Sequence, residues 1–345
     1  MFVLSILACQ PSPSDADVDA GGDTGPDTRP DPRPDDTARA EDVFPTSRQA
    51  VEWPFSTRSP WNMPLGDAAA LSVTDDPCTV SLRSRGYTPW INAEKWSHPI
   101  FLSSEGDPAR EIWADEELAA TAPVPEAATP ALPEWPDTDA HMHIIDPLGQ
   151  YVDEMWKARR RDDGGWDVDS WARVDLYGEG VGTGGVRVYG GSAIAGLIRV
   201  GEVEAGIHHA LSLALALDLL APVWVWPASE LSTTREDDYL GAVATGQLVA
   251  LPPGFDIGAQ GWSEEGEAVA RALQHYGAYV TDHASGFALY AAPEAEADVD
   301  PARDDLADIR SHLRCVTDNT QATPGGAGAR LAPLAPELEG AGTEG

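Results

Sequence analysis

The chain has 345 residues and a formal net charge of −35, from 57 acidic and 22 basic side chains. This balance argues against nucleic-acid binding, because neutralising phosphates needs clustered Lys and Arg. Beyond the first nine residues, no run of the sequence approaches the roughly 20 consecutive apolar residues of a membrane span.

Residues 1–9 form an apolar run that ends in Ile6-Leu7-Ala8-Cys9. This segment resembles the end of a bacterial lipoprotein signal, in which the Cys becomes lipid-modified after cleavage. The resemblance implies that Cys9 is the lipidated residue, and that Gln10 rather than Asp after it favours the outer membrane or cell surface of a Gram-negative bacterium. No Lys or Arg precedes the run, which departs from the pattern. The alternative is a Cys that follows an apolar N-terminus by chance.

Residues 10–45 are rich in Asp, Pro and Gly and contain little to bury. We expect them to be a disordered, extended tether that holds a domain off a membrane. Residues 46–320 are expected to form the folded domain. The Gly-, Ala- and Pro-rich residues 321–345 are expected to be a disordered tail.

The domain is expected to be mainly β, a β-sandwich or jelly roll with a few short helices. Its short runs of Val, Ile, Tyr and Trp are separated by frequent Pro and Gly, which is typical of such folds. The turn residues Asp146-Pro-Leu-Gly149 predict a β-hairpin from 141 to 158. Ser263 predicts a helix start and Gly277 its end. A strand pair over 278–282 and 287–290 and a helix over 304–315 follow.

Cys78 and Cys315 remain as a pair if Cys9 carries lipid. In an oxidising compartment they are candidates for a disulfide that joins the start of the domain to its end. Two separate thiols are the alternative, because the sequence gives no distance between them.

Three side chains are candidates for catalysis. Glu154 shares a strand face with Trp156, and a carboxyl against an indole would have a raised pKa, as a general acid needs. Asp175 would be the second carboxylate of a glycosidase, with Arg173 to keep it ionised or to bind a uronate. His209 or a Tyr would be the base of a lyase. The alternatives are a surface carboxylate paired with Lys157 or Arg159 for Glu154, and a core histidine for His209.

His141 and His143 lie two residues apart on the first strand of the hairpin and therefore share a face. Two such imidazoles converge on a metal or on a substrate. No Glu follows at cupin-type spacing, so we expect no metal and no cofactor, and we place His141 with the substrate-binding residues.

The chain contains twelve Trp, many beside polar residues. Exposed indole faces on a β-sandwich stack against sugar rings, so Trp156 and Trp171 are candidates for substrate binding. The alternative for any single Trp is a place in the core.

A set of short motifs resembles a little-characterised family of secreted bacterial proteins, over roughly residues 50–295. The motifs are Pro60-Trp-Asn62, Asp139-Ala-His-Met142, Glu154-Met-Trp156, Gly196-Leu-Ile-Arg199, His209-Ala-Leu211, Trp226-Pro-Ala228 and Tyr276-Gly through Asp282. The resemblance implies a β-sandwich in a carbohydrate-related setting. It implies no particular reaction.

Two hypotheses for function follow. The first is a surface-anchored glycoside hydrolase or polysaccharide lyase that acts on an extracellular polysaccharide. The second is a glycan-binding or adhesion lipoprotein without catalysis, in which the aromatics stay exposed and the acids do not converge. The direction of the Glu154, Asp175 and His209 side chains separates them.

Overall fold

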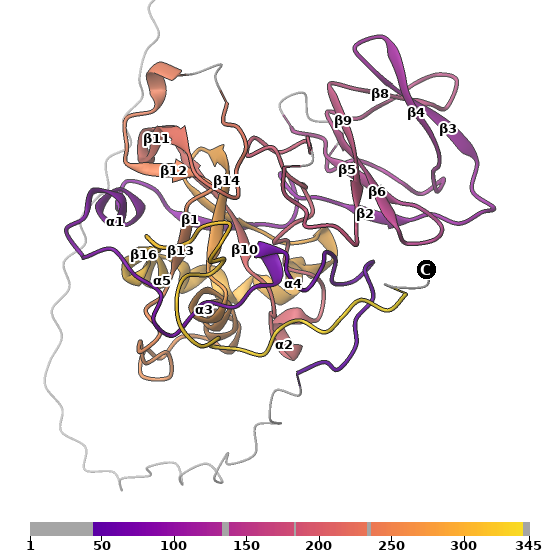
Figure 1. Cartoon of the computed structure of the whole chain (residues 1–345). Coiled ribbons are helices and arrows are strands. Elements are labelled where there is room, and N and C mark those ends of the chain that lie inside the picture. The colour runs from indigo at the N-terminus through magenta and orange to yellow at the C-terminus, as the bar shows by residue number, and fades with distance from the viewer. Residues whose placement is uncertain (1–43, 133–137, 183, 233–235, 341–345) are drawn as a thin grey trace, which may run out of the picture. The chain divides into compact units, whose positions relative to one another are not determined.

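The structure is a computed structural model, and it describes residues 44–132, 138–182, 184–232 and 236–340. Cys9, Gln10 and nearly all of the predicted tether lie outside these residues. The described residues form one compact unit. The fold is mainly β, as predicted, with several sheets and few short helices (Figure 1). Within the described segments, no helix is long and apolar enough to cross a membrane.

The largest sheet has six strands of mixed direction. Their order is β1 (Pro89–Asn92), β15 (Phe287–Tyr290), β10 (Leu211–Ala216), β14 (Ala278–Ala284), β13 (Leu248–Ala250) and β16 (Arg314–Cys315). The central strand β10 is buried along its whole length, which explains its continuous apolar sequence. Strands β14 and β15 form as predicted but do not pair with each other, because β10 lies between them. A separate pair, β11 (Leu220–Trp224) and β12 (Val243–Thr245), lies beside this sheet.

Helices cover one face of the six-stranded sheet. Leu211, Leu213 and Leu215 of β10 share a core with Val269 and Leu273. These two belong to α3 (Glu264–His275), which Ser263 caps through the Gly266 amide and which Gly277 follows at φ 77°. The predicted helix is therefore confirmed. The shorter helices are α1 (Pro77–Leu82), α2 (Glu202–Ala205), α4 (Glu296–Val299) and α5 (Leu306–His312).

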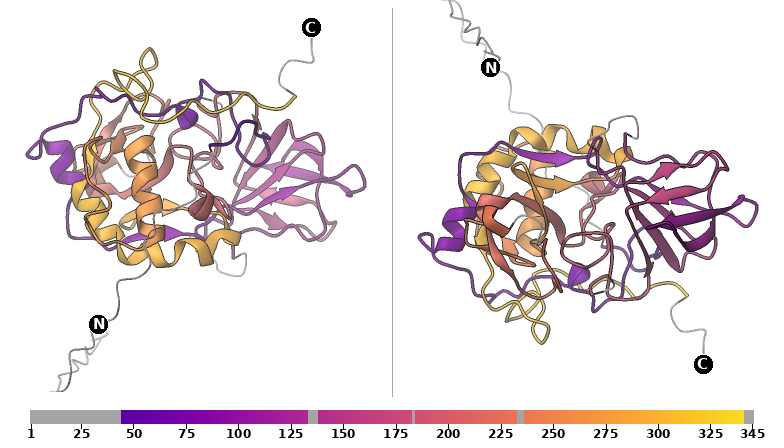
Figure 2. Two further views of the ribbon diagram at one scale, coloured as in Figure 1. Left: turned by 90° about the horizontal axis from the view of Figure 1, so that it is seen from below. Right: turned by 90° about the horizontal axis from the view of Figure 1, so that it is seen from above.

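Two four-stranded sheets form a sandwich at the other end of the unit, drawn in purple and magenta in Figure 2. The inner sheet has the order β2 (Ile100–Leu102), β5 (Met142–Ile145), β6 (Tyr151–Trp156), β9 (Ser170–Asp175). The outer sheet has the order β4 (Glu117–Pro123), β3 (Ala109–Ala114), β8 (Trp166–Val168), β7 (Arg159–Arg160). Ile112, Met142, Ile144, Met155 and Val168 fill the space between them.

The inner sheet is covered on both faces. Met142 and Ile144 face the sandwich core, whereas Ile145 and Val152 pack into a core that contains Tyr189 and Tyr279 of the main body. The predicted hairpin is confirmed, with β5 antiparallel to β6 and the Asp146 carboxylate accepting from turn amides. Because both faces of β5 are buried, its polar residues lie inside the protein.

Residues 321–340 differ from the expected disordered tail. Ala335 and Leu338 are buried, and Leu338 pairs in a bridge with Arg48. Arg330 donates to the carbonyl oxygens of Pro64 and Pro324. Composition suggested disorder, but a few apolar anchors and backbone hydrogen bonds are enough to hold this segment on the body.

Candidate functional site

Three histidines gather between the inner sheet and the main body. His141 precedes β5, His143 lies within it, and His98 comes just before β2. Strand β2 runs parallel to β5, with Ile100 opposite His143, so the chain brings His98 beside the other two. His98 Nδ1 lies 3.0 Å from His143 Nε2, and the ring centroids of His98 and His141 are 4.2 Å apart. All three are buried, with exposed fractions of 0–3%.

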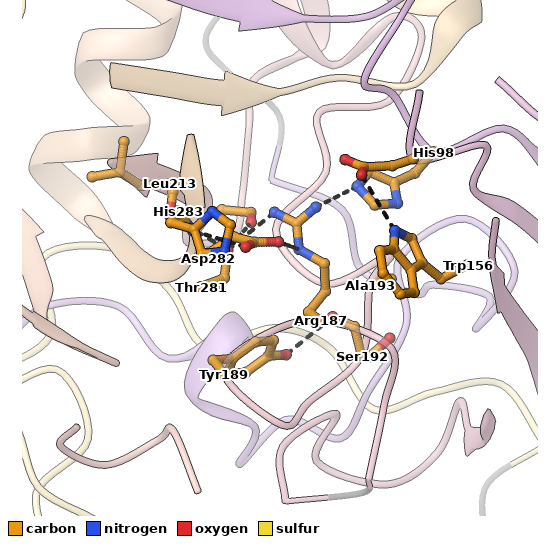
Figure 3. Close-up of polar contacts among 12 residues, drawn as sticks. His98, Trp156, Arg187, Tyr189, Ser192, Ala193, Leu213, Thr281, Asp282 and His283 are labelled. Carbon is orange, nitrogen blue, oxygen red and sulfur yellow. Dashed lines mark hydrogen bonds and ion pairs between the residues drawn. The ribbon is translucent and has the colours of Figure 1, made fainter. Parts of the chain in front are cut away.

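Arg187 joins His98 of this triad to the six-stranded sheet (Figure 3). Its Nη1 donates to His98 Nε2 over 2.6 Å and its Nη2 to Thr281 Oγ1 over 3.3 Å. Its Nε forms an ion pair with Asp282 at 3.3 Å, and its guanidinium lies 4.2 Å from the ring centroid of Tyr290. Arg187 is therefore fixed from three sides.

A β-bulge explains how neighbouring residues of β14 reach the same guanidinium. In a regular strand, Thr281 and Asp282 would point to opposite faces. The pairing of β14 with β10 shifts here, from Leu213 opposite Val280 to Ala214 opposite Asp282. Thr281 is the extra residue, and both side chains contact Arg187. Bulges commonly redirect side chains in this way next to functional sites.

The contact with Arg187 determines which nitrogens of His98 and His143 carry protons. A guanidinium only donates, so His98 Nε2 must accept and the His98 proton resides on Nδ1, where it is donated to His143. Both rings are thus neutral. Burial, then the neighbouring His141 and Arg187, holds the pKa of His98 well below its usual value. Burial and the two nearby arginines lower the pKa of His143 to about 3.

Glu154 is fully buried and has a clear structural partner. Its carboxylate accepts from Ser192 Oγ and from the amides of Ala193 and Ile194. Burial raises its pKa, and these donors offset part of that rise. The carboxylate ties β6 to the loop of residues 192–194, and Trp156, on the same strand face, donates to Asp139 instead.

Asp175 lies on the opposite face of the inner sheet from Glu154. In the pairing of β6 with β9, Glu154 lies opposite Ala172 and Tyr151 lies opposite Asp175. Asp175 is therefore three positions along β9 from the residue opposite Glu154, and an odd number of positions places its side chain on the other face of the sheet. Asp175 is exposed and accepts from the Tyr177 amide. The structure does not bring these two acids together.

Arg173 and Trp171 are both engaged by one buried carboxylate. Arg173 binds Asp153 through two hydrogen bonds of 3.0 and 2.8 Å, and Trp171 Nε1 donates to the same Asp153 over 3.0 Å. Asp153 is only 3% exposed. The predicted substrate-binding residues are therefore divided, with His141 and Trp156 on one face and Trp171 and Arg173 on the other.

His209 lies apart from these residues, before β10. Its Nε2 is 3.1 Å from a Glu202 carboxylate oxygen and its Nδ1 is 3.0 Å from the Ala210 carbonyl oxygen. Both partners only accept, so both ring nitrogens carry protons. Burial alone would lower the pKa of His209, but the Glu202 carboxylate raises it above the usual value. An imidazolium with both protons engaged has no lone pair with which to act as a base.

A small cavity adjoins His209. Its volume is about 20 Å³, which is room for roughly one water molecule. Trp53, Phe55, Trp61 and Arg199 are among the residues that line it. It is too small for a sugar ring.

A much larger depression lies on the outer sheet, on the face away from the sandwich core. Its volume is about 740 Å³, and it is lined by Trp113, Asp115, Glu116, Arg159, Arg161, Asp167, Val168 and Asp169. We call it the outer groove. Trp113 pairs with Asp167 and Asp167 with Arg159 across three neighbouring strands. An indole, a carboxylate and a guanidinium therefore stand in one row.

The turn at the rim of the outer groove has an unusual backbone. Asp115 and Glu116 connect β3 to β4 with φ values of 50° and 65°. A two-residue hairpin turn with positive φ at both positions is normally built from Asn-Gly or Asp-Gly. Asp115 suits the first of these positions, whereas Glu116 occupies the position that usually holds glycine, which costs stability. Strained positions of this kind concentrate at binding sites.

Cys78 and Cys315 form a disulfide, with Cα atoms 6.3 Å apart. It joins α1 to β16 across a sequence separation of 237 residues, and neither cysteine lines the outer groove. Its role is therefore structural.

Searches against protein-family models, curated proteins and solved structures found no match to this chain. Sequence inspection did not single out His98 as the third histidine of the triad, nor Arg187 and Asp282 beside it. It also did not single out the row of Trp113, Asp167 and Arg159. Only the repeated histidines at 141 and 143 carried a usable signal. The partners of each group come from distant segments.

Proposed function

We propose that this protein is a glycan-binding protein held at the bacterial surface, and that the outer groove is its binding site. The observation that carries the proposal is the row of Trp113, Asp167 and Arg159 in a depression of about 740 Å³. This volume falls in the range of ligand sites. The Arg161 guanidinium lies over the Trp113 ring, 5.2 Å from its centroid, so a sugar ring would displace this guanidinium or stack on the opposite indole face. The ionised groups offer hydrogen bonds to hydroxyls.

The charge of the outer groove favours a neutral or amino-bearing glycan. Four carboxylates line it, against the two guanidinium groups of Arg159 and Arg161. Both arginines already contact groove carboxylates, with Arg159 bound to Asp169 at 2.8 Å and Arg161 to Asp167 at 2.6 Å. A polyuronate would bring further negative charge to this surface and to a chain of net charge −35.

Binding without catalysis is favoured over the hydrolase and lyase hypotheses. A glycosidase needs two carboxylates across one sugar, about 5–10 Å apart. Glu154 is closed off by its backbone partners, and Asp175 projects from the opposite sheet face. The lyase hypothesis needs a free base, and both nitrogens of His209 are occupied.

The test is a binding panel with Trp113→Ala. The full chain would be tested on insoluble cellulose and chitin and on soluble xylan, with alginate and polygalacturonate as acidic glycans. We expect binding to a neutral or amino glycan that weakens about tenfold or more in Trp113→Ala. Trp224→Ala is the matched control, because Trp224 is 49% exposed on β11 and lies outside the outer groove.

Two results would overturn the proposal. One is equal glycan binding by Trp113→Ala and the wild type. The other is release of reducing ends or unsaturated uronides from any member of the panel, which would restore the enzyme hypothesis.

The surface location rests on the sequence of residues 1–9. Lipid modification at Cys9 would supply the acyl chains that stable anchoring needs. We expect the wild type in the outer-membrane fraction of a Gram-negative host and a Cys9→Ser variant in the soluble fraction. Mass spectrometry of the mature N-terminus should show an acylated Cys9, and an unmodified Cys9 would contradict the assignment.

A further inference from the structure

The triad of His98, His141 and His143 has the donor chemistry of a transition-metal site. One nitrogen from each ring lies within 4.8 Å of those of the other two. Three neutral imidazoles are a donor set that suits Zn²⁺, Cu²⁺ and Ni²⁺, whereas Ca²⁺ and Mg²⁺ prefer oxygen ligands. The buried location separates this cluster from the chance groupings of surface histidines.

The triad also has hydrogen-bonding capacity that the protein does not use. Within the described part of the chain, neither His141 Nδ1 nor His143 Nδ1 has a hydrogen-bond partner, although both atoms are buried. A buried polar nitrogen without a partner is costly, and most proteins avoid it. Two such atoms in one cluster of three rings indicate that the set is completed by something else.

We propose that His98, His141 and His143 bind one divalent transition-metal ion, with Zn²⁺ as the expected occupant. The ion would link the segment before β2 to the β5–β6 hairpin. Three imidazoles leave a fourth position for a water molecule or another ligand, as in other three-histidine zinc sites. This site is separate from the outer groove, and the proposal does not depend on glycan binding.

Metal binding requires a local rearrangement around His98, which gives the proposal a specific signature. A neutral imidazole that ligates a metal through one nitrogen carries a proton on the other. If His98 ligates through Nδ1, its Nε2 is protonated and loses its contact with Arg187; if it ligates through Nε2, the metal takes the place of Arg187. In both cases the 2.6 Å contact between Arg187 and His98 breaks. The 3.0 Å hydrogen bond between His98 Nδ1 and His143 Nε2 breaks as well, because a metal-bound nitrogen cannot take part in it and two N–H groups cannot bond to each other. Arg187 keeps Asp282, Thr281 and Tyr290 as partners.

The experiment measures metal content and geometry in the full chain, purified without a polyhistidine tag. After incubation with Zn²⁺ and dialysis, we expect about one zinc per chain by mass spectrometry of the elements. Co²⁺ should give the intense visible bands of a four-coordinate site. X-ray absorption of the zinc-loaded wild type should show nitrogen ligands at about 2.0–2.1 Å. An all-oxygen shell, or no zinc retained, would overturn the proposal.

Variants locate the ion. His143→Gln and His98→Asn should each lower zinc affinity by about 100-fold, while His312→Gln on the surface of α5 should bind like the wild type. Circular dichroism would establish which variants fold. Arg187→Gln should raise zinc affinity about tenfold, because it removes a positive charge beside the ion and the contact that competes for His98. Equal zinc binding by the wild type and by folded triad variants would place the metal elsewhere and refute the assignment.

Discussion

Glu154 and His143 lie directly opposite each other on the paired strands β6 and β5, and both are fully buried on the same face. One is a carboxylate closed by backbone amides and the other an imidazole in a cluster with an unused nitrogen. Two polar groups at one register position thus differ in whether their hydrogen-bonding capacity is satisfied. The difference comes from what the main body places above each of them.

Replacing Glu154 should destabilise the fold. Glu154→Ala leaves Ser192 Oγ and two backbone amides without their acceptor in a buried location. Each such loss costs about 1–3 kcal/mol, so we expect the free energy of unfolding to fall by about 3–5 kcal/mol. Urea denaturation measures it. Asp175→Ala is the control, with a change below about 1 kcal/mol because Asp175 is exposed. Equal effects of the two variants would contradict the structural role.

The Glu202–His209 pair should make stability depend on pH. The pKa of His209 is raised in the folded state, so folding favours its protonated form. The stabilisation is fully present below the unfolded pKa and is lost as the pH rises through the folded pKa. We expect Glu202→Gln to cost about 2 kcal/mol near pH 5.5 and progressively less at alkaline pH.

Urea unfolding of wild type and Glu202→Gln across pH 5.5–9 tests this. The difference between the two proteins removes contributions shared by both, including those of the other histidines. A difference that stays constant across this pH range would show that His209 is neutral in the folded protein.

The strained turn at the rim of the outer groove should trade stability against binding. Replacing Asp115-Glu116 by Asn-Gly puts a glycine at position 116, where Glu116 has a φ of 65°, and keeps at position 115 a residue that tolerates positive φ. We expect the free energy of unfolding to rise by about 1 kcal/mol or more. If the two carboxylates contact a glycan, affinity should fall several-fold in the same variant. Thermal unfolding and the glycan panel measure the two effects, and stronger binding by the variant would argue against a role for these acids.

Removing the disulfide should lower stability without affecting the outer groove. The bond between Cys78 and Cys315 closes a loop of 237 residues. Loss of such a constraint on the unfolded chain costs about 3–5 kcal/mol. We expect the double variant Cys78→Ala, Cys315→Ala to unfold at lower urea concentration and to be insensitive to added reductant. Glycan affinity should stay unchanged at a temperature where the variant is folded.

The mainly β class, the hairpin at Asp146–Gly149 and the helix from Ser263 were determined by the sequence itself. These features depend on local chemistry: a carboxylate that binds turn amides, a glycine at positive φ, a serine that caps a helix. Such interactions act within a few residues, so a sequence pattern is enough to predict them.

The groupings that matter for function were decided only by the tertiary structure. Parallel pairing of β2 with β5 brings His98 to His143 across 45 residues, and a bulge at Thr281 turns two neighbours toward Arg187. Pairing of β3, β8 and β7 makes one row of Trp113, Asp167 and Arg159. Local pattern placed Glu154 correctly on its strand but could not show that the loop at residues 192–194 covers it. Strand order and register are long-range choices made by the packing of the whole core, and no short segment encodes them.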